Sequence, residues 1–227
     1  MKKLALSITA LAVILAVSFT SCKKEDTGAP VVTIKGAALI TLDLGDTYQE
    51  LGATATDEED GDITPVATGT VNPDQVGEYI ITYKATDEAG NEGTATRKVQ
   101  VTAEKIAGSY SVVETDQAGG TFTYTQVVAF SQQGYNKLVF TGFGGYGASS
   151  TTIGSVSGNT IALAEVTFTT SAPDPAGSNR VYDISGTIVK VNTFYNVATM
   201  SYKAVFTPTG GVPQAVTTTT QAYSIVR

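Results

Sequence analysis

The chain of 227 residues contains no histidine, no tryptophan and a single cysteine. These absences exclude serine or cysteine nucleophiles activated by histidine, zinc sites built on imidazole, and a disulfide framework within the chain. Positive charge is also scarce, because 14 basic residues stand against 21 acidic ones and the formal net charge is −7. A chain of this sign repels phosphate backbones, so we expect no nucleic-acid partner.

Residues 1–21 are predicted to be a secretory signal peptide. Two lysines precede an apolar run from Leu4 to Phe19, which is too short to be a convincing transmembrane helix. The segment Phe19-Thr20-Ser21-Cys22 resembles the lipobox of bacterial lipoproteins, with phenylalanine where that family prefers leucine. The resemblance implies that Cys22 is the acylated first residue of the mature protein, since several acyl chains make a lasting anchor. The alternative is an incidental thiol behind an ordinary secretory signal.

Residues 22–29 are expected to form a flexible tether. Their charged segment Lys23-Lys24-Glu25-Asp26 resembles the signal that directs lipoproteins of Bacteroidota to the outer face of the outer membrane. This resemblance implies an outer-membrane protein that faces the cell exterior. The alternative is a solvated tether on a lipoprotein retained in the periplasm.

Charge and aromatic residues divide the mature chain into two segments. Residues 22–103 hold 15 acidic and 6 basic residues, a net −9, whereas residues 104–227 hold 6 of each. The second segment has seven phenylalanines and eight tyrosines, whereas the first has three tyrosines and no phenylalanine. Such different surfaces and cores indicate two domains, which we place at residues 30–102 and 104–227.

The first domain is predicted to be a β-sandwich of the immunoglobulin (Ig) type. In residues 78–86, Tyr79, Ile81, Tyr83 and Ala85 occupy one face and largely polar residues the other, which is the pattern of a half-buried strand. About seven such strands fit into the domain, and Tyr79 is placed to make the hydrogen bond of a tyrosine corner.

Several short motifs in the first domain together resemble one family of domains. They are Leu44-Gly45-Asp46 with Tyr48, Gly52-Ala53-Thr54-Ala55-Thr56-Asp57, Asp60-Gly61-Asp62-Ile63-Thr64, Val76-Gly77-Glu78-Tyr79, Tyr83-Lys84-Ala85-Thr86-Asp87, Ala89-Gly90-Asn91, and finally Arg97 and Val99. Together they resemble the bacterial Ig-like domain that also occurs in pesticidal crystal proteins, a relative of hyalin-repeat modules. The resemblance implies a spacer or interaction module rather than a catalyst.

An acidic run at residues 57–62 raises the question of calcium. Aligning Gly61 with the invariant glycine of an EF-hand loop puts Thr56 and Ala67 at the first and last ligand positions, which excludes that motif. A loop site is still open, because strands B and F of an Ig sandwich run parallel and would bring Asp57 and Asp87 to one pole, near Asp60 and Asp62. The alternative, which we favour, is that these carboxylates cap turns without any metal.

The second domain is expected to be an antiparallel meander of about eight strands, an up-and-down β-barrel or a sandwich, so the fold class is all-β throughout. Turn signals recur along residues 106–227, and alternating runs such as Phe122, Tyr124, Val128 and Phe130 give each strand one apolar face. Gly186 lies where the alternation weakens and indicates a β-bulge. The opening residues 106–112 resemble the first strand of lipocalin-like domains appended to Bacteroidota lipoproteins.

The glycine-rich tract at residues 140–150 is the candidate contact surface. Phe143 and Tyr146 offer flat faces on which a sugar ring or another protein can stack, and Asp174 and Arg180 can add polar contacts. The alternative, which we favour, is that both rings fold back as a lid over the end of the barrel.

These observations predict a non-enzymatic surface lipoprotein that needs no cofactor. No paired carboxylates suited to glycoside hydrolysis stand close together in the second domain. The first function hypothesis is glycan capture by the barrel-like domain, with the Ig-like domain as spacer. The alternatives are a structural or protein-interaction module of an outer-membrane assembly without a small ligand, and a lipocalin-like carrier, which would need an open cavity in its barrel.

Overall fold

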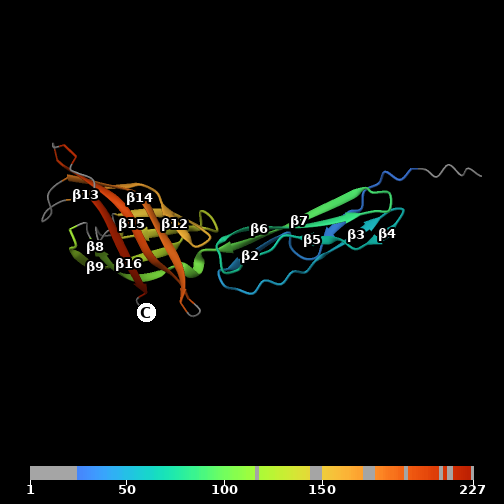
Figure 1. Ribbon diagram of the computed structural model, residues 1–227, viewed down its shortest axis with the longest axis horizontal. Helices are drawn as coiled ribbons and strands as arrows, with labels where there is room; N and C mark the ends of the chain where they lie inside the picture. The colour runs from blue at the N-terminus through green and yellow to red at the C-terminus, as the bar shows by residue number, and fades with distance from the viewer. Residues whose placement is uncertain are drawn as a thin grey trace, which may run out of the picture.

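A computed structural model shows two β domains joined end to end in one elongated molecule (Figure 1). The structure describes residues 25–115, 118–143, 150–170, 177–191, 194–209, 212–213 and 217–225. The architecture is all-β, which confirms the predicted fold class. Among the described residues, no helix has the length and apolar character needed to cross a membrane.

Seven strands build the first domain, as the sequence predicts. They are β1 (Val31–Ile34), β2 (Leu39–Asp43), β3 (Ala53–Asp57), β4 (Gly61–Ile63), β5 (Val66–Thr68), β6 (Gly77–Thr86) and β7 (Glu92–Thr102). One sheet has the order β1-β3-β4 and the other the order β2-β7-β6-β5. Strand β2 runs parallel to β7, and the remaining neighbours are antiparallel.

The core of this sandwich follows the alternation of strand β6. Ile81, Tyr83 and Ala85 are buried, and the intervening Lys84 is exposed. The hydroxyl of Tyr79 donates a hydrogen bond of 2.9 Å to the backbone oxygen of Gln75, four residues upstream. This contact is the predicted tyrosine corner.

The second domain is a curled antiparallel sheet, called here the barrel-like domain. A short 3₁₀ turn, η1 (Glu104–Ile106), leads into β8 (Gly108–Thr115), β9 (Thr121–Phe130), β10 (Lys137–Thr141), β11 (Thr151–Ser157), β12 (Thr160–Leu163), β13 (Val166–Thr170), β14 (Gly177–Val191), β15 (Phe194–Pro208) and β16 (Thr217–Ile225). Successive strands pair as a meander, β16 pairs with β8, and both β12 and β13 pair with β14. Because β12 and β13 follow one another along β14, they form one interrupted strand, and the meander has about the eight strands expected.

Gly186 in strand β14 lies between two irregularities in the pairing with β15. The register shifts between Tyr182 and Ser185, where Asp183 has a φ of 52°, and again between Thr187 and Ile188. A Cβ atom on Gly186 would lie 2.6 Å from the backbone oxygen of Thr199. The glycine therefore permits a close approach of the two strands, and instead of the bulge predicted at Gly186 the register shifts lie on either side of it.

Buried side chains line the inside of the curled sheet along the described strands. They include Tyr110, Val112, Val128, Leu138, Phe140, Val156, Ile161, Val197, Met200 and Tyr202, each at most 4% exposed. This interior is packed like a core, whereas a carrier of apolar molecules needs an open cavity. Over the side chains that the structure describes, this packing argues against the lipocalin-like carrier.

Candidate functional site

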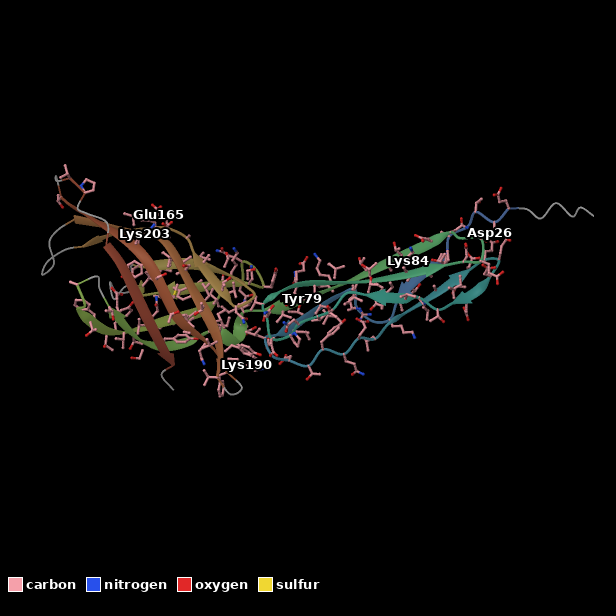
Figure 2. All side chains as sticks on the ribbon, viewed as in Figure 1. Asp26, Tyr79, Lys84, Glu165, Lys190 and Lys203 are labelled. Atoms are coloured by element: carbon pink, nitrogen blue, oxygen red, sulfur yellow. The ribbon has the colours of Figure 1, made fainter. Side chains whose placement is uncertain are left out.

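The pole of the Ig-like domain farthest from the barrel-like domain brings together three carboxylates. Asp57 ends strand β3 and Asp87 follows strand β6, and Asp26 approaches them from the segment before β1 (Figure 2). One side-chain oxygen of each lies within 4.8 Å of the others. The parallel course of these two strands places Asp57 and Asp87 at one pole, as the sequence predicts, and Asp26 is the member that the sequence did not indicate.

Hydrogen bonds in the adjoining turns hold both buried carboxylates. Asp57 Oδ1 accepts from the backbone N–H groups of Glu59 at 2.8 Å and Asp60 at 3.0 Å. Asp87 accepts from the backbone N–H of Asn91 at 2.7 Å and from its side-chain amide at 2.8 Å. Burial acts to raise the pKa of Asp87, but these bonds outweigh it and hold the pKa below its ordinary value.

The other two acidic candidates do not belong to this group. Asp60 accepts from the backbone N–H of Glu88 at 2.6 Å, and Asp62 lies 3.5 Å from the hydroxyl of Thr56. Three carboxylates are the ligand type that Ca²⁺ prefers, but the ion takes six to eight oxygens, so backbone oxygens and water would have to complete the shell. The observed hydrogen bonds give Asp57 and Asp87 a turn-capping role that needs no ion.

Asp26 also bears on the predicted tether. The side-chain amide of Asn91 donates to the backbone oxygen of Asp26 at 3.3 Å, and the N–H of Gly28 bonds the Asp26 carboxylate at 2.9 Å. Asp26 therefore contacts the Ig-like domain, so this residue of the predicted tether does not extend from the domain as free linker. Cys22 lies outside the described residues.

A buried arginine with acidic and aromatic partners organises the middle of the Ig-like domain. Arg97 is fully buried, its guanidinium donates to the backbone oxygen of Lys35 at 2.6 Å, and it pairs with Glu50 at 3.5 Å. Burial and a hydrogen bond to Glu50 raise the pKa of Tyr83 to about 12. Burial raises the pKa of Glu50, but hydrogen bonds from Tyr48 and Tyr83 and the charge of Arg97 bring it below its ordinary value. Arg97 and Tyr83 are buried inside the sandwich, and the more exposed Glu50 is their acidic partner, so we assign the cluster to stability.

The barrel-like domain has two ends, of which only one faces the Ig-like domain. Its proximal end faces the Ig-like domain. Its distal end, on the opposite side, carries the strand termini Thr115, Thr121, Thr141, Thr151, Thr170, Gly177, Pro208 and Thr217 (Figure 1). The loops predicted to bind therefore connect strands at the distal end. The predicted contact residues Phe143, Tyr146, Asp174 and Arg180 come from two of these connections and their flanks.

One of these predictions needs correction, because Phe143 is not exposed. Its side chain is fully buried, and its ring packs against Tyr202 with centroids 5.4 Å apart at a tilt of 58°. The inward alternative therefore holds for Phe143, which is a core residue and cannot serve as a stacking surface. Tyr146 and Asp174 lie outside the described residues. For Arg180 only the backbone is described, paired with Thr167 and Val205.

A carboxylate that the sequence did not single out lies beside these rings. Glu114, one residue before the end of β8, accepts hydrogen bonds from the hydroxyls of Tyr202 at 2.7 Å and Tyr124 at 3.1 Å. The alternation of β8 contains the signal, since Tyr110 and Val112 are buried and Glu114 continues that face. The distal end thus combines a carboxylate with tyrosine hydroxyls, which are groups that hydrogen-bond to polar ligands.

Comparisons with known proteins address the first domain. Residues 32–101 match the family model described as "Bacterial surface protein, Ig-like domain". This match confirms the predicted domain type over nearly all of residues 30–102, and it supports a surface-associated protein. No functionally curated protein matches the chain.

Two solved structures resemble the chain at low identity. A lipoprotein from Bacteroides thetaiotaomicron is 20% identical, with a TM-score of 0.32, 86% of this chain covered and 100% of that chain. A carbohydrate-binding module 51 bound to GlcNAc, with INT domains, from ZmpB of Clostridium perfringens is 14% identical, with a TM-score of 0.28, 87% of this chain covered and 44% of that chain. At these TM-scores neither resemblance carries an argument about function.

Proposed function

We propose that the protein is a non-enzymatic surface lipoprotein, held in the outer membrane through Cys22 and facing the cell exterior. The observation that carries the proposal is the opposition of the two ends of the molecule. The chain enters near Asp26 at one extreme, and the distal end of the barrel-like domain lies at the other (Figures 1 and 2). The Ig-like domain therefore holds the distal end away from the membrane, where it can bind molecules outside the cell.

The proposed ligand of the distal end is a glycan, captured as a nutrient. Glu114 and Tyr124, which are both partly buried, supply a carboxylate and a hydroxyl suited to sugar hydroxyls, whereas the buried Tyr202 orients Glu114 from the core. The sequence adds Tyr146, between β10 and β11, as the aromatic residue on which a sugar ring can stack. With no histidine in the chain, these groups fit binding better than hydrolysis. Calcium is not required for this proposal.

Binding of the mature full-length chain to a glycan array, followed by titration calorimetry with the best hit, tests the proposal. Tyr146→Ala should weaken binding about tenfold or more, which corresponds to about 1.4 kcal/mol. Phe194→Ala is the matched control, because its ring is 44% exposed at the proximal end, and it should bind as the wild type does. Absence of any glycan affinity, or equal affinities of both variants, would overturn glycan capture.

The second candidate is a structural or protein-interaction module without a small ligand. It rests on the spacer role that the Ig-like family implies and on the absence of tryptophan, which sugar-binding platforms often use. Pull-down from solubilised membranes decides between the two. A stoichiometric outer-membrane protein partner without glycan affinity would support this second function.

A further inference from the structure

The junction between the two domains is built like the inside of one domain. Leu44, Val76, Val101 and Ala103 of the Ig-like side are at most 2% exposed, and they belong to the same continuous hydrophobic cluster as the core of the barrel-like domain. Domains that merely follow one another share small polar contacts and move relative to each other. A shared apolar core removes that freedom, since separating the domains would expose these side chains to water.

Backbone hydrogen bonds cross the junction at two places. The N–H of Gly158, in the turn after β11, donates to the oxygen of Val76 at 2.9 Å, and these two residues form an antiparallel β-bridge. The N–H of Ala103 donates to the oxygen of Tyr135 at 2.8 Å, in the connection between β9 and β10. Such bonds have fixed geometry, so they set the angle between the domains as well as holding them together.

The hairpin between β14 and β15 adds a third contact on the outside. The hydroxyl of Tyr195 and the ammonium of Lys190 both bond the carboxylate of Asp74, and the Lys190 contact is 2.6 Å long. The Tyr195 ring lies over Gly45, where a Cβ atom would be 2.8 Å from the ring. Gly45 also has a φ of 87°, so both its backbone and its surroundings require glycine. Figure 2 shows Lys190 and Tyr79 on either side of the junction.

The linker itself is packed into the junction. Ile106 in η1 is fully buried, and its backbone oxygen accepts a bond of 2.5 Å from the hydroxyl of Tyr110. Lys105 pairs with Asp46 at 2.5 Å and ties η1 to the loop after β2. Ala103 and Ile106 are buried, and Lys105 is paired with Asp46, so the connection is held at three of its residues.

We infer that the Ig-like domain is a fixed plug for the proximal end of the barrel-like domain, so that both domains form one rigid cooperative unit. The inference is independent of any ligand. On this inference the Ig-like domain is a rigid spacer and not a flexible extension, so it sets both the distance and the orientation of the distal end of the barrel-like domain. It also closes the proximal end of the curled sheet, so that a ligand of this domain is met at the distal end.

Differential scanning calorimetry of the mature full-length chain tests this inference. The wild type should unfold in one transition, with calorimetric and van't Hoff enthalpies that agree. Val76→Asp places a charge in the junction and should split the trace into two transitions, the lower well below the wild-type Tm. Val66→Asp is the matched control, because Val66 is 65% exposed on β5, and it should keep the single transition.

If the Val76→Asp chain fails to fold, Val76→Ala provides a milder test of the same junction. It removes two methyl groups without adding charge and should lower the Tm, with a van't Hoff enthalpy that falls below the calorimetric one. Two resolved transitions in the wild type, or a Val76→Asp trace that matches Val66→Asp, would overturn the inference.

Discussion

The hydroxyl of Tyr195 in the barrel-like domain donates a hydrogen bond to the carboxylate of Asp74 in the Ig-like domain. The same carboxylate accepts from Lys190, and these bonds hold the pKa of Asp74 below its ordinary value of 3.8, the bond from Lys190 having the larger effect. A single acidic side chain thus connects the two domains on the surface of their junction.

This connection predicts a dependence of stability on pH. Because the pKa of Asp74 is lower in the folded state, its contribution is fully present above the unfolded-state pKa of about 3.9 and is lost as the pH falls through the folded-state value. Asp74→Asn should therefore lower the Tm at pH 7, and the difference from wild type should shrink below about pH 4. A Tm difference that stays constant from pH 7 to pH 2 would contradict the assigned pairing.

Removing the partner of the buried arginine should be far more damaging than removing a surface ion pair. Glu50→Ala leaves the fully buried Arg97 without its carboxylate and should destabilise the protein by about 3 kcal/mol in urea unfolding. Glu92→Ala removes the exposed partner of Lys84, at 2.5 Å, and should change stability by less than about 1 kcal/mol. Equal effects would show that the Arg97 cluster is not a structural centre.

Phe143→Ala should act on stability and not directly on binding. The ring is fully buried against Tyr202, so its removal leaves a cavity that should reduce the free energy of unfolding by about 3 kcal/mol or more. Phe122→Ala is the control, because Phe122 is 58% exposed on β9. Urea unfolding of the two variants measures the difference, and similar small losses would mean that Phe143 is not a core residue.

Variants at the acidic pole of the Ig-like domain distinguish a turn-capping role of its carboxylates from calcium binding. Asp87→Ala leaves the N–H and amide groups of Asn91 without their acceptor and should lower stability by about 1–3 kcal/mol. Asp62→Ala removes only an exposed side chain and should change stability by less than about 0.5 kcal/mol. Capping alone predicts the same Tm in millimolar calcium and in chelator. A calcium-dependent rise in the Tm that Asp87→Ala abolishes would instead assign the three carboxylates to an ion.

Local alternation and known strand geometry predicted much of this structure. The inward face of β6, the tyrosine corner at Tyr79 and the meeting of Asp57 with Asp87 all follow from strand period and from parallel strands in an Ig sandwich. The meander of the second domain was equally accessible, because each hairpin connects neighbours in sequence.

Contacts between segments that are distant in the sequence could not be predicted from such local patterns. Whether the Phe143 ring turns inward depends on Tyr202, which belongs to a strand much later in the chain. The bridge from Val76 to Gly158 likewise joins two turns that no local pattern relates. Glycine-rich and turn sequences specify backbone freedom but not the partner of a side chain, so the core at the distal end and the junction had to come from the structure.

The central claim, a lipid-anchored protein displayed on the cell exterior, is tested most directly by protease treatment of intact cells. Wild-type cells should lose the membrane-bound protein to added protease, and a periplasmic control protein should survive. In a Cys22→Ala strain the protein should be absent from the membrane fraction. Persistence of the wild-type protein in protease-treated intact cells, or membrane attachment of Cys22→Ala, would contradict the account.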